Sequence, residues 1–156
     1  MVFEECKEIL LKESELVQRI ADLQNHIREA VVNRNWTDFE GHFKVLGEMG
    51  EEFSALESER EQLFDGIQGG DGFYTVVSRF PAAQRSELAD IYRNLKLDVL
   101  KVQLAGEELM AYIASARATM TGFFEAAFPD RGGKIYTPHG IPVSHDMRSM
   151  VLNRCF

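Results

Sequence analysis

The fold is decided by residues 9–31, which read ILLKESELVQRIADLQNHIREAV. Extended toward the N-terminus, this stretch carries two rows of mostly apolar residues at alternating spacings of three and four: Val2, Ile9, Leu16, Leu23 and Ala30, and Cys6, Glu13, Ile20 and Ile27. That spacing places both rows on one side of an α-helix. Glu13 is the one break, and Leu10, Val17 and Val31 widen the stripe to the face of a helix in a bundle. A long amphipathic first helix is predicted.

A second long helix is predicted from Thr37 to Ile67, after an interruption at residues 33–36. Thr37 and Glu40 have the spacing of a capping box, in which each side chain satisfies an unpaired N–H of the first turn. This helix has two apolar rows. The first is Phe39, Leu46, Phe53 and Ile67, and the second is Met49, Leu56 and Leu63. Each row contains one polar residue, Arg60 in the first and His42 in the second. Its glycines are Gly41, Gly47 and Gly50. Each costs about 1 kcal/mol of helix propensity, so they either allow close helix approach or leave the stretch less rigid.

The glycine-rich residues 69–72 are the clearest linker in the chain. Phe73, Val76, Val77 and Phe80 follow it at the spacing of a short helix, although residues 74–77 also read as a strand. We predict the helix from the periodicity.

The third long pattern follows Pro81 and stops before Pro129, with Gly106 as its gap. Its two rows are Leu88, Leu95, Val102, Leu109, Ala116 and Phe123, and Tyr92, Val99, Ile113, Met120 and Ala127. Residues 129–156 are rich in proline, glycine and histidine and cannot continue a helix.

The predicted fold class is all-α. Amphipathic helices cannot bury their apolar faces alone, which favours an antiparallel bundle of three long helices and a short one over residues 1–128. Residues 129–156 are expected to form an irregular, flexible tail and a partner-binding segment. A long dimeric coiled coil is the competing architecture, which the breaks near 33–37 and 68–72 disfavour.

Composition narrows the class of protein. The chain has 156 residues, 45% of them hydrophobic, and 25 acidic against 17 basic side chains. Enough apolar residues are present for a core, and the net charge of −8 disfavours nucleic-acid binding. The acidic N-terminus is unlike a signal peptide, and no apolar run is long enough for membrane insertion. We therefore expect a soluble cytoplasmic protein, with Cys6 and Cys155 as reduced thiols.

The sequence offers little material for catalysis. The helical seams are nearly all apolar, and no nucleophile, base and orienting partner can be assembled, so we expect no enzyme, no catalytic residues and no cofactor. No HExxH motif occurs. Asp22 with His26, and Asp38 with His42, are interpreted as solvent-side charge pairs. His139 and His145 are interpreted as polar loop residues, so no metal site is predicted. The glutamates at 51, 52, 57, 59 and 61 are expected on a solvated face.

Large apolar side chains crowd the end of the third long pattern: Met110, Tyr112, Met120, Phe123, Phe124 and Phe128. They fit either core packing or a groove that binds an apolar helix of another protein, with methionine tolerating varied partners. Both interpretations stay open at this point.

The order of the elements resembles flagellar export chaperones of the FlgN type. The likeness rests on two long leading helices, a short helix ending at Phe80-Pro81, one long third helix, and a tail in which Tyr136 and Gly140 match a Tyr-x-x-x-Gly segment. One departure is that the third helix carries a single asparagine, Asn94, where members of that family commonly carry several.

The resemblance implies a chaperone that binds hook-associated flagellar proteins through its third helix and tail, and delivers them to the export gate, where Tyr136 would dock. On this basis the expected partner-binding residues are Leu109, Ile113, Met120, Phe123, Phe124, Phe128, Tyr136 and Gly140. A self-associating coiled-coil adaptor without a secretion role is the alternative, and homodimer formation is left open.

Overall fold

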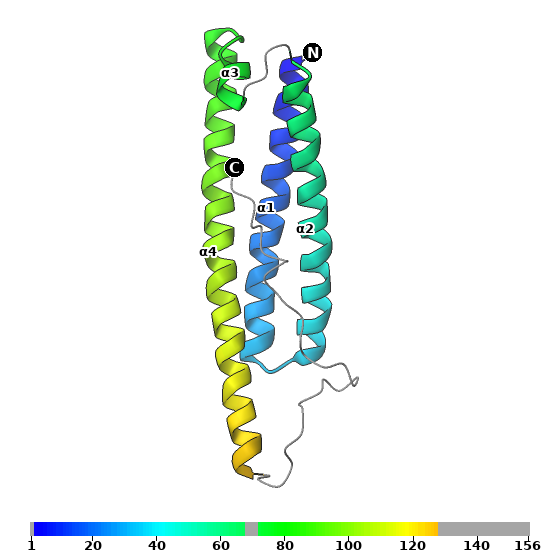
Figure 1. Cartoon of the computed structure of the whole chain (residues 1–156), viewed down its shortest axis with the longest axis vertical. Helices are drawn as coiled ribbons and strands as arrows, with labels where there is room; N and C mark the ends of the chain where they lie inside the picture. The colour runs from blue at the N-terminus through cyan, green and yellow to red at the C-terminus, as the bar shows by residue number, and fades with distance from the viewer. Residues whose placement is uncertain (1, 68–71, 128–156) are drawn as a thin grey trace.

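The computed structural model of the chain describes residues 2–67 and 72–127, which form four α-helices and no strand (Figure 1). The helices are α1 (Val2–Val32), α2 (Trp36–Asp65), α3 (Phe73–Val77) and α4 (Ala82–Ala127). The all-α prediction is confirmed. The short helix predicted after the glycines is confirmed as α3, and the strand alternative for residues 74–77 is wrong. The tail predicted over 129–156 lies outside the described residues.

Helix α1 packs against both α2 and α4. Figure 1 shows α2 returning antiparallel to α1, whereas α4 starts at the same end as α1 and runs in the same direction. Side-chain pairs spaced along α1 and α4 join the two helices: Lys7 to Glu87, Gln18 to Asp98, and Arg28 to Glu108. Each joins residues 80 positions apart, so the two helices keep one register along their shared length.

The apolar stripe predicted on α1 is confirmed from Cys6 onward, whereas Val2, the first residue of the predicted row, is exposed by 43%. The buried residues of α1 are Cys6, Ile9, Leu10, Glu13, Leu16, Val17, Ile20, Leu23, Gln24, Ile27, Ala30 and Val31. The predicted rows on α4 are buried from Leu88 to Leu109. Helix α3 covers one end of this core, where the rings of Phe73 and Tyr92 stack with centroids 3.8 Å apart. Burying these side chains is the main stabilising term of the fold.

The turn between α1 and α2 is compact. Arg34 adopts a left-handed conformation (φ 55°), while its N–H donates to the carbonyl of Val31 and the N–H of Asn35 donates to the carbonyl of Ala30. This is a Schellman ending of α1. The Asn35 side chain then caps α2 by accepting from the N–H of Asp38. The predicted Thr37 cap is therefore wrong, because the turn has already placed a better capping residue two positions earlier.

Helix α2 departs most from the sequence prediction. Its buried residues are Phe53, Glu57, Arg60 and Phe64, whereas the predicted leucines Leu46, Leu56 and Leu63 are only partly buried. The prediction that Glu57 lies on a solvated face is wrong. Glu57 is buried beside Arg60, with Oε1 and Nη2 3.9 Å apart, because the buried guanidinium needs nearby negative charge.

The glycines of α2 and α4 behave differently. A Cβ added at Gly41 or Gly50 would meet nothing within 4 Å, so neither glycine is needed for close helix approach. A Cβ at Gly106, by contrast, would lie 3.2 Å from Nε2 of Gln24 on α1. That amide donates to the carbonyl of Val102 at 3.0 Å. Gly106, the gap in the predicted α4 rows, therefore lies where α1 and α4 pack closely and a side chain would crowd Gln24.

Candidate partner-binding surfaces

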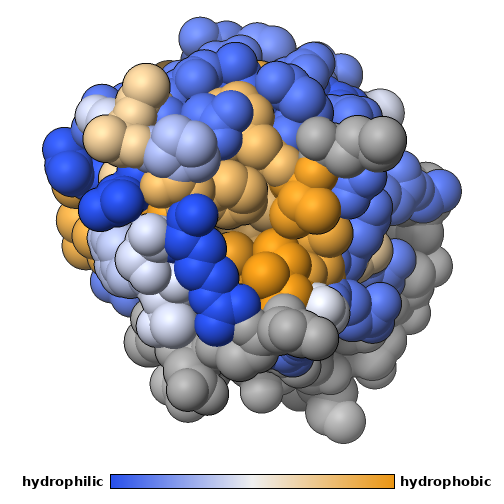
Figure 2. All heavy atoms as spheres, turned by 90° about the horizontal axis from the view of Figure 1, so that it is seen from above, coloured by the Kyte–Doolittle hydropathy of each residue, from blue (hydrophilic) through white to orange (hydrophobic). Residues whose placement is uncertain are grey.

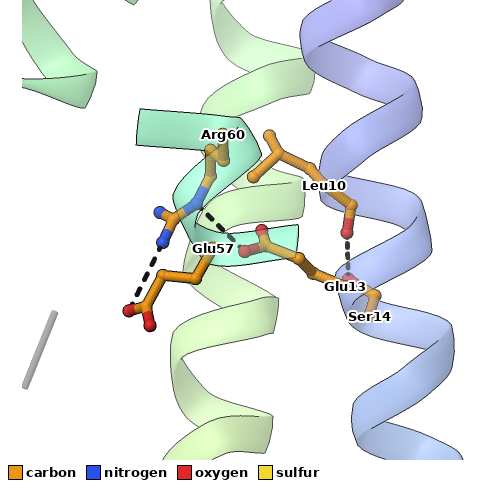
Figure 3. A network of polar contacts seen from close by, with 5 residues as sticks. All are labelled: Leu10, Glu13, Ser14, Glu57 and Arg60. Atoms are coloured by element: carbon orange, nitrogen blue, oxygen red, sulfur yellow. Dashed lines mark hydrogen bonds and ion pairs between the residues drawn. The ribbon is translucent and has the colours of Figure 1, made fainter. Parts of the chain in front are cut away.

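Figure 3 shows a charged cluster buried between α1 and α2. Nε of Arg60 donates to Oε1 of Glu13 at 3.1 Å, and Glu57 lies on the other side of the guanidinium. The Arg60 guanidinium carbon also lies 5.7 Å from the centroid of the Tyr92 ring on α4. Arg60 thus contacts all three long helices.

This cluster is buried. Glu13 has no exposed surface, and its Oε2 accepts no hydrogen bond from the described residues. Burial raises the pKa of Glu13 to about 7, against the opposing effect of the nearby Arg60 charge. The three side chains of the cluster are buried, and the Glu13–Arg60 contact joins α1 to α2.

A candidate binding surface begins where α4 extends beyond the ends of α1 and α2. Helix α4 has 46 residues against 31 in α1, and Figure 1 shows its C-terminal part continuing beyond the α1–α2 turn. Leu109 is the last buried residue of α4, and Ile113 is the last apolar side chain packed against the core. We call residues 114–127 the α4 extension; at 1.5 Å per residue it is about 21 Å long.

The α4 extension carries large apolar side chains in the open. The side chains of Met120, Phe123 and Phe124 are exposed there, and Phe123 has an exposed fraction of 70%. Its only charged residues are Arg117 and Glu125. Large contiguous apolar patches are typical of interaction sites on protein surfaces, so this group is a candidate for one.

The structure thus separates the predicted partner-binding residues into three groups. Leu109 is buried with Leu23 and Ile27 of α1, and Ile113 packs against the same cluster, so both hold α4 on the core. Met120, Phe123 and Phe124 lie together on the exposed extension. The remaining predicted residues, Phe128, Tyr136 and Gly140, lie outside the described residues.

A second exposed apolar group was not predicted from the sequence. Leu97, Leu100 and Leu104 of α4 are exposed by 49, 53 and 65%. They fall outside the two heptad rows of α4, and the sequence prediction considered only residues in those rows. Their own spacing of i, i+3 and i+7 is a helical stripe and is the signal that would have found them.

A third apolar surface lies at the end of the molecule where α3 sits. Figure 2 shows hydrophobic side chains at the centre of this end, ringed by hydrophilic ones. The partly buried residues Phe3, Ile67 and Phe80 pack there against the core, with the rings of Phe3 and Phe80 edge to face at 5.9 Å. These contacts close the core at that end.

The histidines of α1 and α2 lie close to one another. The rings of His26 and His42 have centroids 5.5 Å apart, a contact between two helices that their spacing from Asp22 and Asp38 did not indicate. Within residues 2–67 and 72–127, no three histidine, cysteine or acidic residues cluster closely enough to hold a metal ion. Cys6 is a free, buried thiol.

None of the helices formed by the described residues is both long and apolar enough to cross a membrane. Comparison with known proteins found no family model, no curated protein and no solved structure that matches this chain.

Proposed function

We propose that this chain is a binding protein of the export-chaperone type. In this proposal a bundle of three long helices, each antiparallel to the next along the chain, holds an apolar helical segment of a hook-associated flagellar protein on the α4 extension. The proposal rests on one observation: Met120, Phe123 and Phe124 are exposed on the part of α4 that extends beyond α1 and α2. The resemblance of the helix order and of the Tyr136 tail supports the identity of the partner.

The physical basis is the burial of apolar surface. A client segment that is disordered before assembly folds as it lays its apolar face against the extension. Ordering the segment costs about 2–5 kcal/mol, which keeps affinity moderate and release feasible. Methionine adapts to more than one client side chain. Covering the client's assembly surface would keep it from polymerising before export.

The charge distribution supports the same role. Residues 1–67 carry 16 acidic and 7 basic side chains, and the α4 extension carries one of each. The acidic helices α1 and α2 keep the complex soluble and attract a basic client, while the nearly neutral extension presents little charge to be desolvated on binding.

The test is calorimetric titration of the purified full-length chain with the purified hook-associated proteins of the same genome. We expect a stoichiometric complex with one of them, weakened at least tenfold by Phe123→Ser with Phe124→Ser. The matched control is Leu11→Ser, because Leu11 on α1 is exposed by 47%, close to the 46% of Phe124. Absence of binding by the full-length chain, or equal weakening by the control, would contradict the proposal.

Truncation after Phe128 assigns the role of the tail. If residues 129–156 contribute to the client site, the truncated chain binds the client more weakly than the full chain. If they serve only the export gate, client binding is unchanged and export from the cell is lost.

A further inference from the structure

The outward side of α4 carries the apolar stripe of Leu97, Leu100 and Leu104, which no helix of the described chain covers. A helix turns by about 100° per residue, so these three side chains lie within a sector of about 60°. That sector is opposite the buried residues Leu95, Val99 and Val102, which face α1. The middle of α4 is therefore apolar on both sides.

Charges at the two ends of this stripe have opposite sign. Arg93 lies at its N-terminal end with Asp90 beside it, and Lys96 lies there over the rings of Tyr74 and Tyr92, so that end carries a net positive charge. Glu107 and Glu108 lie at its C-terminal end. Between them, Lys101 is paired with Asp98 of its own helix at 3.4 Å. An arrangement that is basic, apolar and then acidic along one helix is complementary to itself when a second copy is turned end over end.

We infer that the outward face of α4 docks on the same face of a second copy of this chain, antiparallel, about a two-fold axis between Leu100 and Lys101. That axis places Leu97 opposite Leu104 of the second copy. It also places Arg93 opposite Glu108 of the second copy, and each such pair occurs twice in the dimer.

The charged groups can rearrange to form these pairs. Arg93 now lies 3.2 Å from Asp90, and Glu108 lies 3.1 Å from Arg28, and all four side chains are substantially exposed. Exposed ion pairs contribute little, so sharing these groups with a second copy costs little. Three leucines on each side bury less surface than a permanent dimer interface, so the dimer is a reversible one.

This interface is independent of the client site proposed on the α4 extension, because the two surfaces occupy different parts of α4. It also differs from a coiled-coil adaptor, which would associate through its heptad seams. Those seams are buried between α1 and α4 within one chain.

The test is sedimentation equilibrium of the full chain from about 5 to 500 µM, a range that brackets the affinity of a small interface. We expect the average mass to rise from that of one chain toward two. Leu100→Ser with Leu104→Ser is expected to weaken dimerisation at least tenfold, and the control Leu11→Ser to leave it unchanged. A chain that stays monomeric throughout overturns the inference.

A charge-reversal pair tests the antiparallel geometry. Arg93→Glu alone and Glu108→Arg alone each place two like-charge pairs in their own dimer, so each variant is expected to dimerise more weakly than the unmodified chain. An equimolar mixture restores both opposite-charge pairs and is expected to dimerise. Thermal unfolding of each variant checks that it is folded. A mixture that stays monomeric while the unmodified chain dimerises overturns the proposed pairing.

Discussion

Arg60 of α2 and Glu13 of α1 form a buried ion pair, with Nε and Oε1 3.1 Å apart, although 47 residues separate them in the chain. Each is the polar break in an otherwise apolar row of its own helix. The pair fixes which turn of α2 faces which turn of α1, because any slip would leave a buried charge without its partner.

Replacing Arg60 with Met is expected to destabilise the fold by about 3–5 kcal/mol, because the buried Glu13 would lose the guanidinium that it pairs with. Urea unfolding at pH 8, followed by circular dichroism, measures the change. Adding Glu13→Met to Arg60→Met is expected to recover part of the loss. If the double variant is less stable than the single variant, the charge explanation is wrong.

The raised pKa of Glu13, about 7 against 4.5 for the ordinary carboxyl, gives the stability a specific pH dependence. Between these values the folded chain holds a proton that the unfolded chain releases, so the contribution of Glu13 is present at low pH and lost as pH rises through about 7. Relative to Glu13→Gln, the free energy of unfolding should fall by up to about 3 kcal/mol from pH 5 to pH 8. Unfolding curves of both chains across this range measure it.

The control for this pH dependence is Glu15→Gln, an exposed position on the same helix. The difference in free energy of unfolding between this variant and the unmodified chain should not change between pH 5 and pH 8. A flat difference for Glu13→Gln as well would show that Glu13 does not titrate as described.

Replacing Arg34 with Gly is expected to stabilise the fold by about 1 kcal/mol, because the left-handed conformation at this position costs an ordinary residue about that much and costs glycine nothing. Thermal unfolding is the measurement. A destabilisation would indicate that the Arg34 side chain contributes more than its backbone strain costs.

The glycines of α2 and α4 are expected to respond in opposite ways to alanine. Gly41→Ala and Gly50→Ala should each stabilise the fold by about 0.5–1 kcal/mol, because alanine favours the helix and the added Cβ has open space. Gly106→Ala should gain nothing, because its Cβ displaces the Gln24 amide from the Val102 carbonyl. Equal gains at all three positions would mean that α1 and α4 are not in close contact at Gly106.

Substituting serine at Phe123 and Phe124 is expected to change the free energy of unfolding by less than about 0.5 kcal/mol, because both side chains are exposed to solvent. The same change should reduce fluorescence of the dye ANS, which binds exposed apolar surface. A large loss of stability would show that these side chains pack within the fold.

Much of the fold could be predicted from local sequence patterns. The buried side of α1 follows from its heptad rows, because helix period alone decides which side chains share a face. Pro81 and the glycines before it separate α3 from the helices around it for equally local reasons. The apolar character of Met120, Phe123 and Phe124 was also visible in the sequence.

What only the tertiary structure decided concerns contacts between helices. The α4 rows continue without change from Leu109 to Phe123, so their period cannot tell core from surface. The difference arises because the α1–α2 turn ends the neighbouring helices near Leu109, and that depends on the register of α4 on α1. The pairing of Glu13 with Arg60 and the burial of Glu57 depend in the same way on register between distant segments, which no single helix pattern encodes.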